Sequence, residues 1–123
     1  MNLQTNFYKI IDRKKTATGI DYTIGFNADH CIYRAHFPNN PITPGVCIIQ
    51  IIKELSAELL QRNLFLKKVN HVKFLNVINP IQNSETTFSI SVSSPEDNKY
   101  KVETYVYNDI QQFAKLNILF TNE

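Results

Sequence analysis

The sequence predicts an α+β domain in which an antiparallel sheet of about six strands wraps around one long central helix. One apolar segment with helical spacing lies near the middle of the chain, and segments of alternating apolar and polar residues lie mostly downstream of it, separated by short turns. Helices and strands do not alternate, which argues against a doubly wound parallel sheet. The chain fits a single domain, 1–123, because no linker, repeat or low-complexity tract interrupts it.

The strands are predicted from alternation with a period of two residues, which is typical of a sheet with one buried face. In the clearest case, Ile20, Tyr22 and Ile24 alternate with polar neighbours. Turn-forming runs such as Ser94 to Asn98 separate the segments. The other predicted strands are Phe88–Val92, Tyr100–Val106 and Ala114–Phe120, with less regular patterns at Phe7–Ile11 and Val69–Leu75.

The helix is predicted to begin where a proline-rich connector ends. Pro38, Pro41 and Pro44 are three residues apart, and each fixes its own φ and keeps the preceding residue out of the helical region. Thr43 can cap the helix and Pro44 can occupy its first position, which needs no hydrogen bond from its nitrogen. The connector therefore directs a helix N-terminus, although a Pro-x-x-Pro run can also serve as a ligand for an aromatic groove.

A histidine and the first amides of this helix define the candidate chemistry. The amides of Gly45 and Val46 lack acceptors inside the helix and carry the positive end of its dipole, so they suit a carbonyl oxygen that gains negative charge. His36 lies upstream in the same connector, and an imidazole exchanges protons near neutral pH. The alternative is that His36 only hydrogen-bonds its own loop.

The stretch from Ala35 to Val46 carries a specific resemblance. Its pattern, H-F-P-x-x-P-x-x-P-G-V followed by an apolar helix, resembles that of the FabZ/FabA-type 3-hydroxyacyl-[acyl-carrier-protein] dehydratases, which have the hot-dog fold. A weaker likeness continues through Lys73-Phe74-Leu75 and Phe113 to Phe120. The resemblance implies dehydration of a (3R)-3-hydroxyacyl thioester to the trans-2-enoyl thioester in fatty acid, lipid or polyene biosynthesis. It implies no cofactor, because the substrate is carried on the phosphopantetheine of acyl carrier protein.

The resemblance also assigns roles to residues of the connector and the helix. His36 matches the histidine that removes the proton beside the thioester carbonyl, and Gly45 matches the glycine whose amide polarises that carbonyl. Phe37, Pro44 and Val46 are expected to border the substrate. The family places a carboxylate fourteen residues after the histidine, contributed across a dimer interface, and Gln50 occupies that position here.

Gln50 is the main departure from the family pattern, because an amide can orient a departing hydroxyl but cannot release a proton to it. Three interpretations follow: a weak dehydratase in which His36 also returns the proton, a subunit whose partner supplies the carboxylate, or a protein that binds acyl chains without converting them. Gln50 can equally be the start of a solvated polar face on the helix. A further alternative is a hot-dog thioesterase, for which Asp29 is the nearest carboxylate candidate.

Partners are predicted from charge and from the fold. The formal net charge of +2 is too small to suggest a nucleic-acid-binding protein. A curved sheet with open edges favours self-association. The resemblance implies a homodimer or a heterodimer with a related hot-dog subunit, and a higher oligomer is a further alternative. Acyl carrier protein is acidic, so a basic cluster could guide it, although such a cluster can also be plain solvated surface. The residues expected to bind the carrier are Lys67, Lys68 and Lys73.

Cysteine usage and hydropathy set the remaining expectations. Cys31 and Cys47 lack the spacing of a metal site or of a disulfide framework, so no metal is predicted. No N-terminal signal and no run of about 18 apolar residues is found in the sequence, so neither secretion nor a membrane span is predicted. The expected location is the cytoplasm.

Overall fold

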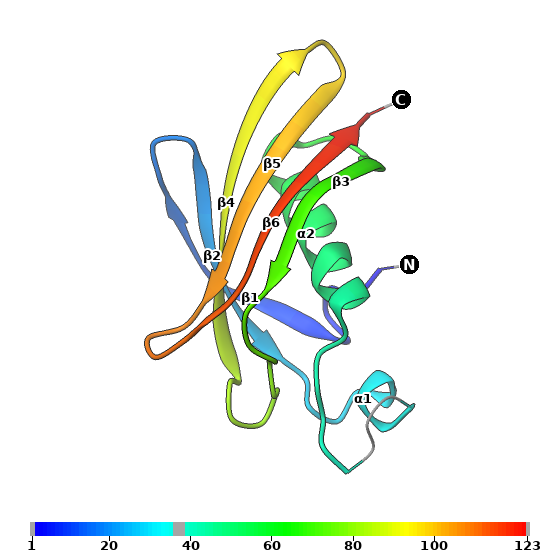
Figure 1. The fold of residues 1–123 in the computed structure, drawn as a ribbon, viewed down its shortest axis with the longest axis vertical. Helices are drawn as coiled ribbons and strands as arrows, with labels where there is room; N and C mark the ends of the chain where they lie inside the picture. The colour runs from blue at the N-terminus through cyan, green and yellow to red at the C-terminus, as the bar shows by residue number, and fades with distance from the viewer. Residues whose placement is uncertain (1, 36–38, 123) are drawn as a thin grey trace.

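The computed structural model describes residues 2–35 and 39–122 and contains a six-stranded antiparallel sheet that curves around a long helix (Figure 1). Along the sheet the strand order is β1-β2-β4-β5-β6-β3. The predicted fold class is confirmed. The elements are β1 (Tyr8–Lys15), β2 (Gly19–Phe26), α1 (Cys31–Ala35), α2 (Gly45–Leu60), β3 (Phe65–Phe74), β4 (Glu85–Glu96), β5 (Lys99–Tyr107) and β6 (Gln112–Thr121).

Helix α2 packs one apolar face against the inner face of the sheet. Ile51, Ile52 and Leu55 are completely buried there, and they meet inward-facing side chains of the central strands such as Phe88 and Ile118. These inward positions are every second residue of β4, β5 and β6, as the alternation predicts. Burial of this kind contributes about 1.5–3 kcal/mol for each large apolar side chain, so the sheet and α2 stabilise each other.

The N-terminus of α2 is formed differently from what the sequence suggests. Pro44 is the N-cap, with φ −62° and ψ 145°, and no side chain caps the helix. The prediction that Thr43 caps the helix and Pro44 occupies its first position is therefore wrong, because the Thr43 hydroxyl is bonded to Tyr33 instead. At the C-terminus Gln61 adopts a left-handed conformation, with φ 55°, which ends the helix.

Strand β3 forms one edge of the sheet, where it pairs with β6 (Figure 1). Its pairing is interrupted between Leu66 and Lys68 and again between Val69 and His71. Four of its five apolar residues are 39–51% exposed, which is unusual for an edge that faces water. They are Phe65, Leu66, Val72 and Phe74. The β3 edge is therefore suited to contact with another chain.

No helix within the described residues is long and apolar enough to span a lipid bilayer.

Candidate functional site

The N-terminus of α2 opens into an apolar pocket of about 290 Å³. Gly45, the first residue of the helix, lies in its wall against the ring of Phe74, the last residue of β3. The space is small but close to the range of small-molecule sites, and its few polar groups are backbone atoms and short side chains. The lining residues are Ile42, Thr43, Pro44, Gly45, Ile48, Phe74, Asn76, Val77 and Ile78.

Gly45 lies in close contact with an aromatic ring. A Cβ atom at this position would lie 2.9 Å from Cζ and 3.1 Å from Cε2 of Phe74, which is too close for carbon atoms. The absence of a side chain lets the ring lie against the first turn of the helix. Residue 45 therefore exposes backbone, rather than a side chain, to the pocket.

The hydrogen bonds of α2 begin at the carbonyl of Pro44. The carbonyl oxygen of Pro44 accepts the amides of Cys47 at 3.0 Å and Ile48 at 3.2 Å, so the amides of Gly45 and Val46 precede the first hydrogen bonds of the helix. They carry the positive end of the α2 dipole. Val46 is 70% exposed and does not line the pocket, whereas Pro44 does.

The connector before α2 is fastened at both ends by one buried contact. The hydroxyls of Tyr33 and Thr43 share a hydrogen bond of 2.9 Å, and both side chains are buried. The ring of Phe7 stacks on Tyr33 with centroids 5.1 Å apart, and the amide of Thr43 donates to the carbonyl of Ile78. Burial raises the pKa of Tyr33, so its hydroxyl stays protonated. His36 and Phe37, between these anchors in the sequence, lie outside the described residues.

Gln50 lies on a different face of α2 from Gly45. It lines a second pocket of about 350 Å³ beside Phe65 of β3, together with residues of the N-terminal segment, of α2 and of the turn after α2. Its Nε2 atom donates to Oε2 of Glu54, one turn further along the helix, at 2.8 Å. Within the described part of one chain, Gly45 and Gln50 line separate pockets.

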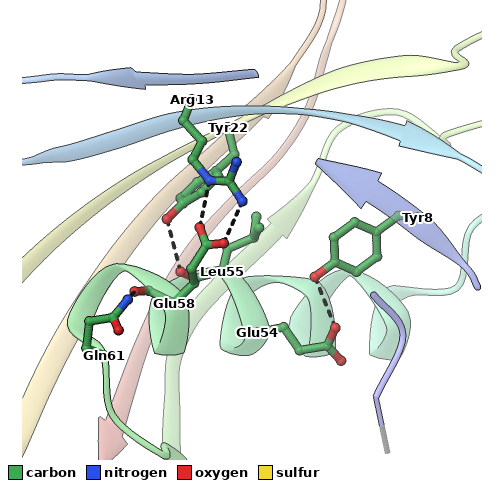
Figure 2. Close-up of polar contacts among 7 residues, drawn as sticks. All are labelled: Tyr8, Arg13, Tyr22, Glu54, Leu55, Glu58 and Gln61. Carbon is green, nitrogen blue, oxygen red and sulfur yellow. Dashed lines mark hydrogen bonds and ion pairs between the residues drawn. The ribbon is translucent and has the colours of Figure 1, made fainter. Parts of the chain in front are cut away.

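Glu54 is the residue beside Gln50 that the sequence did not single out. Its carboxylate accepts the hydroxyl of Tyr8 at 3.0 Å (Figure 2). It also accepts the amides of Leu3 at 2.8 Å and Gln4 at 2.9 Å. Burial and the nearby Glu54 carboxylate raise the pKa of Tyr8, which therefore remains a donor. The i, i+4 spacing from Gln50 is the signal that could have identified it.

Glu58, one turn after Glu54, connects α2 to the sheet and lines neither pocket. The carboxylate of Glu58 accepts hydrogen bonds from Nε of Arg13 at 3.0 Å and from Nη2 of Arg13 at 2.6 Å (Figure 2). Nearby, the hydroxyl of Tyr22 donates to the carbonyl of Leu55 at 3.3 Å. The Arg13 guanidinium lowers the pKa of Glu58. These contacts attach β1 and β2 to the second half of α2.

Residues 12–115 match the family model described as ApeI-like, ApeI dehydratase. The chain belongs to this family. Among related proteins, the ApeI-like chain is 28% identical over 78 residues to the 3-hydroxyacyl-[acyl-carrier-protein] dehydratase FabZ of Rickettsia typhi, in a match that covers 57% of this chain and 52% of the relative. It is 40% identical over 58 residues to FabZ of Dinoroseobacter shibae, in a match that covers 46% of this chain and 34% of the relative. The chain thus spans about half, or less, of the length of these relatives.

Solved structures place the ApeI-like chain in the hot-dog fold. The dehydratase heterocomplex ApeI:P from Xenorhabdus doucetiae aligns with a TM-score of 0.67 at 18% identity, over 91% of this chain and 96% of the other. A protein of the thioesterase superfamily aligns with a TM-score of 0.66 at 13% identity, over 94% of this chain and 84% of the other. At these identities the likeness concerns the fold. The resemblance to FabZ-type dehydratases that the sequence predicts is confirmed.

The lysines predicted to bind a carrier lie on the β3 strand of this ApeI-like chain. Lys68 pairs with Leu119 and Lys73 pairs with Lys115, and these β6 positions alternate with buried ones, so both lysines face outward from the sheet. Lys67 lies at the first interruption of the β3 pairing and is exposed. Lys115, which the sequence did not single out, adds a cation on the same outer face.

The residues weighed for other chemistries lie apart from both pockets. Asp29, the thioesterase candidate, is exposed, and its amide donates to Oδ1 of Asn27. Cys31 is exposed, and Cys47 is a buried side chain of α2. Within residues 2–35 and 39–122, no cluster of three or more metal-ligating side chains is found.

The contact between Tyr33 and Thr43 gives a prediction for stability. In Tyr33→Phe the Thr43 hydroxyl stays buried without its partner, and we expect the free energy of unfolding to fall by about 1–3 kcal/mol. Chemical denaturation of the ApeI-like protein measures the change. Tyr105→Phe is the matched control, because the Tyr105 side chain is 51% exposed. Equal stabilities of the two variants would show that the Tyr33 hydroxyl contributes nothing.

Proposed function

We propose that this chain takes part in dehydrating a (3R)-3-hydroxyacyl thioester on acyl carrier protein to the trans-2-enoyl thioester, in a site shared with a second hot-dog subunit. The observation that carries the proposal is the apolar pocket at the N-terminus of α2, where the amide of Gly45 precedes the helical hydrogen bonds. Membership of a dehydratase family supports the reaction class. The bound acyl chain would lie along the apolar wall of this pocket, and the thioester oxygen would accept a hydrogen bond from the amide of Gly45.

In the proposed mechanism, the imidazole of His36 removes the proton from C2 while the Gly45 amide donates to the thioester oxygen as negative charge builds there. The C3–O bond then breaks, and the hydroxyl leaves as water once it receives a proton from the imidazolium or from an acid of the partner subunit. Gln50 contacts the 3-hydroxyl without protonating it. Pro44, which lines the pocket, borders the substrate together with Phe37.

The site is proposed to need two chains because Gly45 and Gln50 line different pockets of one chain. The exposed apolar side chains of the β3 edge are available to a second subunit. A similar fold occurs in a protein described as a dehydratase heterocomplex, and this favours a related hot-dog subunit as the partner. That subunit would supply the carboxylate that Gln50 replaces, and a homodimer is the alternative.

Incubation with a 3-hydroxyacyl thioester on acyl carrier protein tests the proposal. The purified chain and the chain co-expressed with a second dehydratase-like subunit are compared for products. We expect enoyl thioester from the co-expressed pair and little from the chain alone. If the lone chain turned over substrate as fast as the co-expressed pair, the proposal that the partner subunit supplies the acid would be wrong. Release of free carrier thiol would indicate a thioesterase, and unchanged substrate in both samples would indicate an acyl-binding subunit.

We propose the outer face of β3 as the docking surface for the acidic carrier, through Lys67, Lys68 and Lys73. Reversal of charge in Lys68→Glu with Lys73→Glu is expected to raise KM for the carrier-bound substrate several-fold, while KM for a small thioester analogue is unchanged. The effect should weaken as salt is added. Lys14→Glu on β1, at the other edge of the sheet, is the control. Equal effects on both substrates would exclude docking at this surface.

A further inference from the structure

The pocket at the N-terminus of α2 has a buried inner end and an exposed rim. Thr43, Ile48 and Ile78 are at most 4% exposed, so they form the inner end of the pocket. Val77 is 62% exposed and its neighbour Asn76 is exposed as well, so both residues lie at the rim. An acyl thioester whose hydrocarbon chain points into the pocket would therefore leave the other side of its sulfur at this rim.

Polar side chains are few in this pocket, and one of them is already engaged. The described lining residues include two such side chains, those of Thr43 and Asn76. The hydroxyl of Thr43 shares its hydrogen bond with Tyr33 at the buried end. The Asn76 amide is therefore the side chain placed to meet a polar group of a ligand at the rim.

The side-chain amide of Asn76 is held in one orientation. Its Nδ2 atom donates to the backbone carbonyl of Gln112 at 2.8 Å, and since a carbonyl oxygen only accepts, the nitrogen must face it. The backbone amide of Asn76 donates to the carbonyl of Phe113 at 3.3 Å, which attaches this residue to the start of β6. The Oδ1 atom diverges from Nδ2, and within the described part of the chain it accepts no hydrogen bond. The rim thus has an oriented acceptor.

We propose that Oδ1 of Asn76 accepts a hydrogen bond from an amide N–H of the pantetheine arm that carries the acyl thioester. This inference rests on the proposed dehydratase function, because it takes the thioester oxygen to lie at the Gly45 amide in the same pocket. A pantetheine thioester carries an amide N–H one ethylene unit from its sulfur, whereas a simple alkyl thioester carries none. Because the Asn76 amide is already oriented, little side-chain freedom is lost on binding. Asn76 therefore selects pantetheine-type thioesters over other thioesters.

Two thioether probes test this contact without any need for dehydration. One is S-hexyl-N-acetylcysteamine, and in the other an ester oxygen replaces the amide N–H. We expect the co-expressed complex to bind the amide probe about fivefold more tightly than the ester probe, the effect of one neutral hydrogen bond. Calorimetric titration measures both dissociation constants. Equal constants for the two probes would overturn the inference.

Asn76→Leu removes the acceptor, and Asn70→Leu is the matched control. Asn70 is an exposed asparagine of β3 outside this pocket, and its Nδ2 atom donates to Asn117. We expect Asn76→Leu to bind the two probes equally and Asn70→Leu to keep the preference for the amide probe. A preference that survives in Asn76→Leu would assign the acceptor to another residue and show the inference to be wrong.

Asn76→Asp separates binding from stability. Aspartate keeps an acceptor oxygen but cannot donate to the Gln112 carbonyl, so this variant should lower Tm at least as much as Asn76→Leu does. We nevertheless expect Asn76→Asp to retain the preference for the amide probe. If both variants lose the preference, the contact with Gln112 matters rather than the acceptor, and the role of Asn76 is structural.

The failure of this inference and the failure of the proposed function give different results. A preference for the amide probe that depends on Asn76, in a protein that forms no enoyl thioester, would overturn the proposed dehydration alone. Dehydration by a protein that binds both probes equally would overturn this inference alone. Added salt should leave the preference unchanged, because both hydrogen-bonding groups are neutral, whereas it should weaken carrier docking at the β3 lysines.

Discussion

Replacement of His36 by asparagine is expected to abolish most of the dehydration, with kcat about 10²- to 10⁴-fold lower, the usual contribution of a general acid–base group. The loss should be large because the proposed mechanism depends on this imidazole to take the C2 proton, whichever acid then protonates the leaving hydroxyl. Asparagine keeps a polar side chain of similar size but exchanges no proton at relevant pH. Formation of enoyl thioester under single-turnover conditions measures the chemical step directly.

The control for this experiment is His71→Asn. His71 pairs with Asn117 on the outer face of β3, away from the pocket that contains Gly45. Its replacement should leave kcat unchanged. The pH profile adds a second criterion, since the ionisation assigned to the imidazole should disappear in His36→Asn alone. A His36→Asn variant with wild-type kcat would leave this chain without its proposed base, and the base would then have to belong to the partner subunit.

The half-buried strands were predictable from the sequence because every second residue in each of them is apolar. The prediction Tyr100–Val106 lies within β5, and Ala114–Phe120 lies within β6. The ends of the strands were not predictable, because beyond the core the strands continue by backbone pairing through polar residues that do not alternate with apolar ones. Strand β1 continues from Ile11 to Lys15 through charged residues at a sheet edge, and β4 continues through Pro95 because its pairing is interrupted between Ser93 and Glu96. Helix α1 has five residues, too few to show a helical period.

The candidate site was predictable where one local motif carries it. Pro44 and Gly45 lie at the helix N-terminus, as the connector indicates. The environment of Gln50 was not predictable, because the groups that hold Glu54 are backbone amides about fifty residues earlier in the chain. Backbone donors have no residue signature, so only the fold reveals them. The Tyr33–Thr43 contact was missed for a related reason, since Thr43 also fitted a capping role.

Gly45→Ala is expected to reduce kcat strongly, toward the loss of about 10²- to 10³-fold that follows removal of an oxyanion donor. The added Cβ would lie 2.9 Å from Cζ of Phe74, so either the ring or the first turn of α2 must move. Movement of the turn displaces the amide that is proposed to hold the thioester oxygen. Gly25→Ala on β2 is the matched control, because its Cβ meets the end of the flexible Ile11 side chain at 3.0 Å.

The double variant Gly45→Ala with Phe74→Leu decides which group moves. Phe74 is 51% exposed at the end of β3, so a smaller side chain there frees space beside residue 45 without opening the buried core. If the ring forces the helix turn aside, the double variant should recover much of the lost kcat. Full activity in Gly45→Ala alone would mean that the exposed ring yields and the amide keeps its place. A loss that Phe74→Leu does not relieve would locate the obstruction in the acyl pocket itself, with the new methyl group occupying space that the substrate needs.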